Sequence, residues 1–170
     1  MKILIIGGVA AGTKAAAKLK RENRDLDITI IAKDGDISYA GCGLPYYIGG
    51  FIKDRSSLIV NTPQKYAAMT GVSVLTNVEA ITVDNNNHTV IAKNLITNEE
   101  ASYTYDKLII ATGASPITPP IEGIKKQGVF SLRLPNDAVN IRDYVTNNQV
   151  KKMLLLLVVA LSVLKLLKIF

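Results

Sequence analysis

The only cysteine of this 170-residue sequence, Cys42, lies in a loop of small residues that could leave its thiol open to reaction. The loop, residues 38–47, reads SYAGCGLPYY, with a glycine on each side of the cysteine. A thiolate is the nucleophile that attacks disulfides and peroxides. The alternative is a buried structural cysteine, which is the more usual role of a lone intracellular cysteine. The spacing alone does not choose between the two.

A glycine-rich segment at residues 7–12, GGVAAG, follows a short apolar run at 2–6 and precedes an alanine-rich stretch at 11–22. In dinucleotide-binding folds a strand, a glycine turn and a helix occur in this order. The glycines allow a tight turn and close approach of the backbone to a pyrophosphate, and the helix N-terminus attracts the phosphates. Val9 replaces the second glycine of the usual pattern, and a plain turn between strand and helix is the alternative. The position of the segment favours a dinucleotide site.

One residue departs from the dinucleotide pattern. The second apolar run, at 28–32, ends at Ala32, where an acidic residue normally accepts the ribose hydroxyls. Lys33 and Asp34 follow directly and could partly substitute, although Asp34 is also a typical turn residue.

The predicted elements form an α/β fold. The runs at 2–6 and 28–32, with the helix between them, form a parallel, right-handed βαβ unit. Alternating apolar and polar residues predict an antiparallel meander from strands at 72–76, 79–83, 89–93 and 100–105. A buried strand then returns at 107–111, and Pro116, Pro119 and Pro120 break the chain after it.

Composition excludes several classes of protein. A sequence that is 48% apolar and 20% charged is not a disordered polar chain. One cysteine and one histidine, His88, exclude a disulfide scaffold and predict no metal centre. Four lysines at 151–170 carry four of the six net positive charges and leave +2 on residues 1–150, so we expect no nucleic-acid partner. The apolar start is too short for a secretion signal, which predicts a cytoplasmic location.

Three segments together resemble the FAD-dependent pyridine nucleotide-disulfide oxidoreductases, in the single-cysteine branch of coenzyme A-disulfide reductase, NADH oxidase and NADH peroxidase. They are GGVAAG at 7–12, SYAGCGLPYYIGG at 38–50 and YDKLIIATGASP at 105–116, and the resemblance covers roughly residues 1–148. It implies a FAD-binding Rossmann-like three-layer domain with a small antiparallel β-meander, and a redox-active Cys42 facing the flavin.

The resemblance also assigns residues to the cofactor. It implies that the pyrophosphate lies on Gly7, Gly8, Val9, Ala10, Ala11 and Gly12, the ribose beside Ala32 and Lys33, the adenine beside Ala80, and the rest of FAD along Ile110, Ala111, Thr112 and Gly113.

Features within the branch bear on the substrate. Oxidases and peroxidases of this kind usually carry a histidine in the glycine turn, where this sequence has Ala10. Coenzyme A-disulfide reductases bind the coenzyme A phosphates with the first helix and with the serine before the cysteine. The corresponding residues here are Lys14, Lys18, Arg21 and Ser38. The three basic residues, spaced i, i+4 and i+7, are also typical of a solvated helix face. Gly41 replaces a common asparagine, and Thr70 replaces a possible basic contact.

The resemblance therefore implies a flavoprotein oxidoreductase that reduces coenzyme A disulfide, or a related small-molecule disulfide, with NAD(P)H through FAD and Cys42. One alternative is an NADH oxidase or peroxidase that uses a Cys42 sulfenic acid. The other is an inactive nucleotide-binding or membrane-associated remnant.

The segment 151–170 does not match the family, whose members continue with an NAD(P)H-binding domain and a dimerisation domain. Residues 153–170 read MLLLLVVALSVLKLLKIF, and their apolar run is shorter than the roughly 20 residues of a membrane span. Read one base out of register, the codons permit AVVVGGGFIGLEIAENL, which resembles a nicotinamide-binding fingerprint. We therefore predict a FAD-binding domain at 1–150, a frameshifted hydrophobic tail at 151–170, and a truncated reductase with little or no turnover.

Overall fold

The computed structural model describes residues 1–148, which fall into two compact units. Unit 1 comprises Met1–Tyr39 and Ile59–Ala114, and the described part of unit 2 comprises Ala40–Leu58 and residues 115–148. The predicted tail at 151–170, with its frameshift hypothesis, lies outside the described residues. Within the described residues, no helix is both long enough and apolar enough to cross a membrane.

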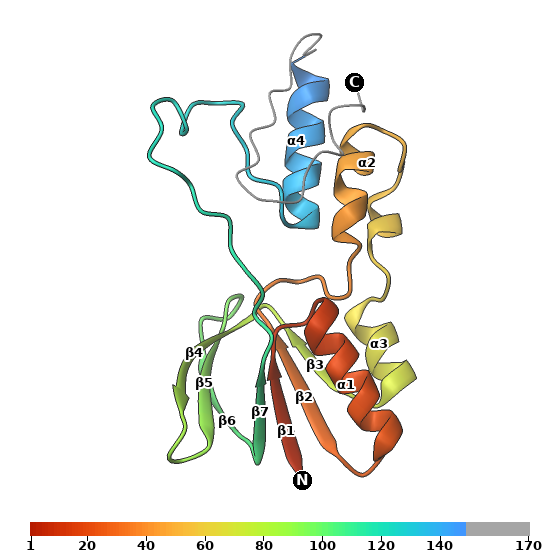
Figure 1. Cartoon of the computed structure of the whole chain (residues 1–170), viewed down its shortest axis with the longest axis vertical. Helices are drawn as coiled ribbons and strands as arrows, with labels where there is room; N and C mark the ends of the chain where they lie inside the picture. The colour runs from red at the N-terminus through yellow and green to blue at the C-terminus, as the bar shows by residue number, and fades with distance from the viewer. Residues whose placement is uncertain (149–170) are drawn as a thin grey trace. The chain divides into compact units, whose positions relative to one another are not determined.

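Unit 1 is built on a four-stranded parallel sheet in the order β3-β2-β1-β7 (Figure 1). The strands are β1 (Lys2–Ile6), β2 (Asp27–Ala32), β3 (Ser73–Thr76) and β7 (Lys107–Ile110). Helix α1 (Ala10–Glu22) connects β1 to β2, and α3 (Pro63–Thr70) precedes β3. The predicted βαβ unit and the return of the chain at β7 are therefore confirmed.

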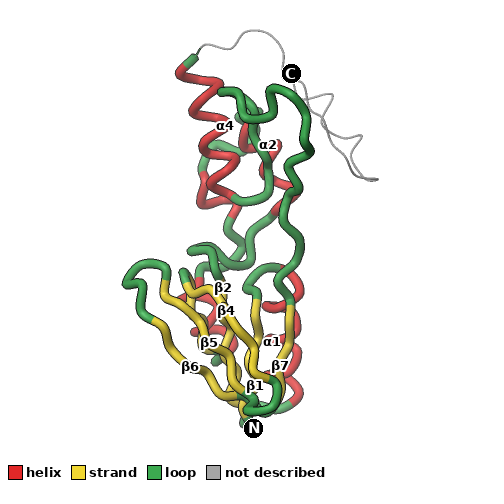
Figure 2. The backbone as a smooth tube through the Cα atoms, turned by 90° about the vertical axis from the view of Figure 1, so that its left-hand side faces the viewer, coloured by secondary structure: helices red, strands yellow, loops and turns green. Residues whose placement is uncertain are grey.

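The two central strands, β1 and β2, are mostly apolar because both faces of the parallel sheet are covered there (Figure 2). On β1, Ile3 and Ile5 belong to a core that includes Ala16 of α1 and Tyr66 of α3. Leu4 and Ile6 point the other way, into a core with Tyr105, which follows β6 (Glu100–Thr104), and with residues of the antiparallel sheet: Val78, Val90 and Ala92. The alternation along one strand thus fills two cores and gives the predicted three-layer α/β arrangement.

The antiparallel sheet has three strands, β4 (Val78–Asp84), β5 (Thr89–Asn94) and β6 (Glu100–Thr104), in sequence order. The prediction that residues 72–76 also belong to the meander is wrong. These residues form β3, which pairs in parallel with β2 at the edge of the main sheet. The reason is the preceding helix α3, which the sequence analysis did not predict and which carries the chain across to this edge in the parallel direction.

Unit 2 consists of short helical elements from two distant parts of the chain. Residues 40–58 contribute the 3-10 turn η1 (Gly41–Gly43), helix α2 (Leu44–Ile48) and the 3-10 turn η2 (Arg55–Leu58). Helix α4 (Pro135–Asn147) completes the unit. As the three prolines predict, no helix or strand occurs between β7 and α4.

Candidate functional site

The turn after β1 has no room for side chains at two of its glycines. A β-carbon on Gly7 would overlap the carbonyl oxygen of Ala111, and one on Gly12 would overlap the carbonyl oxygen of Gly7. Gly7 also has a φ of +117°, a region that other residues rarely adopt. These two glycines therefore fix how the chain passes from β1 into α1.

The first turn of α1 is open to an anion. Val9 precedes the helix without a side-chain cap, and the first turn contains no acidic residue. The first N–H groups of a helix have no partner inside it, and together they carry a partial positive charge. Behind them, the Thr13 hydroxyl donates to the carbonyl of Val9 and so holds the start of the helix. The backbone here is suited to a phosphate.

The predicted cofactor segments of unit 1 meet at the carboxyl edge of the parallel sheet. The Gly7 N–H donates to the Ile31 carbonyl at 2.8 Å, and the Ala111 N–H donates to the Ile6 carbonyl at 2.7 Å. A β-carbon on Gly8 would lie 2.9 Å from that of Ala32, so the turn also touches the end of β2. Residues 110–113 follow at the end of β7. Ligands of open α/β sheets bind at this edge.

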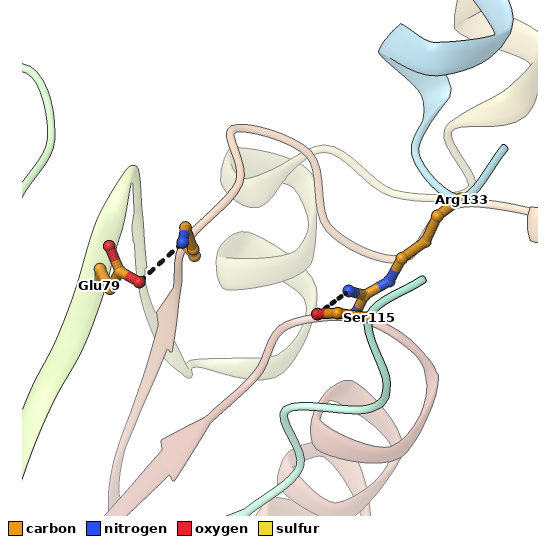
Figure 3. Close-up of polar contacts among 4 residues, drawn as sticks. Glu79, Ser115 and Arg133 are labelled. Carbon is orange, nitrogen blue, oxygen red and sulfur yellow. Dashed lines mark hydrogen bonds and ion pairs between the residues drawn. The ribbon is translucent and has the colours of Figure 1, made fainter. Parts of the chain in front are cut away.

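Beyond β2, the chain provides an ion pair that the sequence analysis missed. Lys33 Nζ lies 2.7 Å from Glu79 Oε1, across a separation of 46 residues (Figure 3). Glu79 precedes Ala80, the predicted neighbour of the adenine, on β4. Positions 33 and 80 are thus brought together in unit 1. The pair was missed because β3, which leads into β4, was assigned to the wrong sheet.

Ser38 is attached to the glycine turn through its backbone. Its N–H donates to the carbonyl of Gly8 at 3.1 Å, and its own carbonyl accepts from Val60 at 2.9 Å. Its φ of 49° lies in the left-handed region. These bonds hold the backbone of Ser38 beside the turn that precedes α1.

The three basic residues predicted to bind substrate all lie exposed on α1. Lys14 is near the start of the helix, whereas Arg21 is in its last turn. Lys18 is paired with Glu22 at 2.8 Å, and its ammonium group lowers the pKa of that carboxyl. Both side chains of this ion pair are exposed, so the pair is weak and Lys18 can pair with another anion instead.

Tyr66 packs α3 against α1. The ring is buried, and its hydroxyl donates to the carbonyl of Thr13. Burial raises the pKa of the Tyr66 hydroxyl, because the phenolate would lose its hydration. The contact fixes the helix layer behind the glycine turn.

Cys42 belongs to unit 2, where it is a free and exposed thiol in η1. The buried structural cysteine is therefore the wrong alternative. Gly43 is glycine for a packing reason, since a β-carbon would lie 3.1 Å from Leu58 and 3.4 Å from Ile52. Gly41 has open space around it. The position of Cys42 beside the cofactor stays a prediction.

Helix α4, which was not predicted from the sequence, supports the segment that carries Cys42. The guanidinium of Arg142 lies 4.6 Å from the ring centroid of Tyr47 on α2, and its Nη1 donates to the carbonyl of Lys53 at 3.0 Å. The Asp137 carboxylate accepts from the backbone N–H of Leu134 at 2.8 Å and so caps α4. Proline at position 135 and an aspartate two residues later were the available signals for a helix start.

The connection into α4 is tied down by a further arginine of unit 2. Arg133 Nη1 donates to the hydroxyl of Ser115 at 2.9 Å (Figure 3). The bond spans 18 residues and closes the proline-containing segment between β7 and α4.

Comparisons with known proteins agree with this geometry. An NADH oxidase of Methanocaldococcus jannaschii is 38% identical over 152 residues, which cover 89% of this chain and 34% of that protein. A coenzyme A disulfide reductase of Staphylococcus haemolyticus is 35% identical over 153 residues, or 90% of this chain and 34% of that protein. The chain thus spans about a third of the length of these relatives.

A solved structure gives the same result for the fold. The crystal structure of reduced CoADR-RHD of Bacillus anthracis matches 87% of this chain and 27% of that chain, with a TM-score of 0.84 and 36% identity. The family model described as pyridine nucleotide-disulphide oxidoreductase matches residues 1–159. The chain belongs to this family, whose members use FAD and NAD(P)H.

Proposed function

We propose that unit 1 binds FAD at the carboxyl edge of its parallel sheet and that Cys42 is the thiol of a flavin-linked disulfide reduction driven by NAD(P)H. The observation that supports it most is the tight glycine turn against Ala111, which leads into a helix with no side-chain cap. A turn with a purely structural role would also need the glycines. Such a turn would be more stable with a capping residue before the helix, because capping residues stabilise helices, and α1 has none.

The residues present fit FAD. The backbone at 7–12 would hold the pyrophosphate, since the first N–H groups of α1 are available there. Ala32 and Lys33 would lie by the ribose and Ala80 by the adenine. Ile110, which is 66% exposed at the end of β7, would lie with Ala111, Thr112 and Gly113 along the cofactor. An exposed isoleucine at this edge is a suitable surface for an aromatic ring.

FAD, when bound, would carry two electrons from NAD(P)H to the disulfide. The chemistry of this chain's own residue is thiol–disulfide exchange. The Cys42 thiolate attacks one sulfur of the substrate disulfide, a bond forms between the two sulfurs, and the other half of the substrate leaves as a thiolate. The product is a mixed disulfide on Cys42, with no net oxidation in this step.

The substrate we propose is coenzyme A disulfide. The relative from Staphylococcus haemolyticus is named a reductase of this compound. Coenzyme A carries several phosphate groups, and the exposed Lys14, Lys18 and Arg21 offer positive charge along α1. Ser38, held against the glycine turn, offers a hydroxyl from the same unit.

A second candidate is an NADH oxidase or peroxidase, because the relative from Methanocaldococcus jannaschii is named an NADH oxidase. For peroxide, the Cys42 thiolate would attack one oxygen, giving a sulfenic acid and releasing hydroxide. Position 10, at the start of α1, is alanine and offers no acid–base group for this chemistry. The disulfide reaction is therefore preferred.

Mass spectrometry after incubation with coenzyme A disulfide tests the proposal. We expect one coenzyme A adduct per chain, located on Cys42 and removed by dithiothreitol, and none in Cys42→Ser. Hydrogen peroxide at the same concentration is expected to modify Cys42 more slowly. Peroxide oxidation to a sulfenic acid that outpaces adduct formation would favour the oxidase, and absence of both reactions would contradict the proposal.

A further inference from the structure

The end of β2 lacks the carboxylate that dinucleotide-binding folds place there for the ribose hydroxyls. The residue at this point, Ala32, is 4% exposed, and its β-carbon faces Gly8 of the turn. A larger acidic side chain at this position would have to fit beside that turn. The structure offers a carboxylate from another strand instead.

Glu79 reaches the end of β2 from β4. Ala32 pairs with Thr76 on β3, and the chain then turns at Asn77, whose φ is 56°. The Asn77 N–H donates to the carbonyl of Asp34 at 3.4 Å, which keeps the turn against the segment that follows β2. Glu79 follows two residues later, at the start of β4.

Lys33 orients this carboxylate. Its Nζ lies 2.7 Å from Glu79 Oε1, and Figure 3 shows Glu79 projecting from β4 toward this partner. The Glu79 side chain is 35% exposed, so a ligand can reach it. Among the described residues, no hydrogen bond is made to Oε2. An ionised carboxylate accepts at both oxygens, so the pair keeps free acceptor capacity.

We propose that Glu79, positioned by Lys33, accepts hydrogen bonds from the ribose hydroxyls of the adenosine half of the dinucleotide and so replaces the acid missing at Ala32. The inference rests on the proposed FAD site, because it places the ribose next to positions 32 and 33. An ionised carboxylate makes stronger hydrogen bonds to a hydroxyl than a neutral acceptor does.

The test is the binding of FAD, ADP and 2′-deoxy-ADP to the full 170-residue chain, measured by titration calorimetry. We expect the unmodified chain to bind ADP about tenfold more tightly than 2′-deoxy-ADP, the effect of one hydrogen bond to a charged group. Glu79→Gln is expected to lower ADP affinity by about the same factor and to abolish the preference for the hydroxyl. Glu100→Gln, on the exposed strand β6, is the matched control and is expected to change neither.

Lys33→Gln is a second variant, in which Glu79 keeps its charge but loses its partner. We expect it to reduce the preference for ADP over 2′-deoxy-ADP without removing it. Circular dichroism and thermal unfolding confirm that each variant is folded. A full preference for ADP in folded Glu79→Gln would overturn this inference alone. Failure of the unmodified chain to bind either FAD or ADP would overturn the proposed function and this inference with it.

Discussion

Gly7 and Ala111 lie so close that no β-carbon fits between Gly7 and the carbonyl oxygen of Ala111. Gly7 also donates its N–H to the carbonyl of Ile31, so one residue contacts both β2 and the residue that directly follows β7. The turn that would hold the pyrophosphate is therefore fixed by β2 and β7 on its two sides. Its shape depends on packing as well as on local glycine content.

Gly7→Ala is expected to destabilise unit 1 and to weaken FAD binding. The methyl group overlaps backbone and the φ of +117° is strained, which together cost about 2 kcal/mol or more. Chemical denaturation gives the free energy of unfolding, and fluorescence titration gives FAD affinity. Gly35→Ala is the control, since its β-carbon would lie 3.5 Å from Asn77, an ordinary contact. Equal stability of the two variants would contradict the packing argument.

Alkaline pH is expected to destabilise the protein partly through Tyr66. The folded pKa of its hydroxyl is raised above the unfolded value of 10.0, so the unfolded chain loses this proton first as the pH rises. The contribution is complete below pH 10 and is lost as the pH rises through the folded pKa. Denaturation at pH 9 and 11 should show a smaller loss of stability in Tyr66→Phe than in the unmodified chain. Tyr46→Phe, at an exposed position, should behave like the unmodified chain.

Arg142→Ala is expected to loosen α2 without affecting unit 1. The variant removes the contact with Tyr47 and the hydrogen bond to the Lys53 carbonyl, with an expected loss of about 1–3 kcal/mol in unit 2. Hydrogen exchange should be faster for the amides of α2 and unchanged for those of β1. Arg24→Ala, an exposed position in unit 1, is the control. Unaltered exchange in α2 would show that α4 does not stabilise it.

Lys14→Gln and Arg21→Gln are expected to lower the rate at which the Cys42 thiolate attacks coenzyme A disulfide. The rate of its attack on hydroxyethyl disulfide is expected to stay unchanged. The first compound has phosphates that these side chains can attract, and the second has none. Each exposed charge is expected to change the rate about two- to fivefold at low salt and less at high salt. Lys65→Gln, on the exposed side of α3, provides the control. Equal slowing with both disulfides would assign these residues no role in phosphate recognition.

Continuous apolar runs made much of unit 1 predictable. Residues 2–6 form β1 with the predicted bounds, and the run at 28–32 lies within β2, because a strand buried on both faces is mostly apolar. Residues 72–76 were assigned to the wrong sheet because alternation reports burial on one face and not the direction of pairing. Helix α3 sets the direction in which β3 pairs. It begins after Thr62, at Pro63, and ends before Gly71, whose φ is 71°. These capping signals were present in the sequence.

The candidate site was less predictable than the fold. The glycine turn and its contact with residues 110–113 follow from local sequence and strand order. The contribution of Glu79 could not be predicted in this way, because its ion pair with Lys33 depends on the direction that the chain takes from β3 into β4. The exposure of Cys42 was also undecided, since a glycine can serve packing, as Gly43 does, or accessibility.

We propose above that FAD binds at the glycine turn of unit 1 and that the Cys42 thiol takes part in the flavin-linked reaction. The most direct test is the visible absorbance of the purified 170-residue chain after FAD is added and unbound FAD removed. We expect a yellow protein with long-wavelength absorbance that rises as the thiol ionises and is missing in Cys42→Ser. A chain that retains no flavin, or one whose spectrum is the same with serine at position 42 at every pH, would contradict the account.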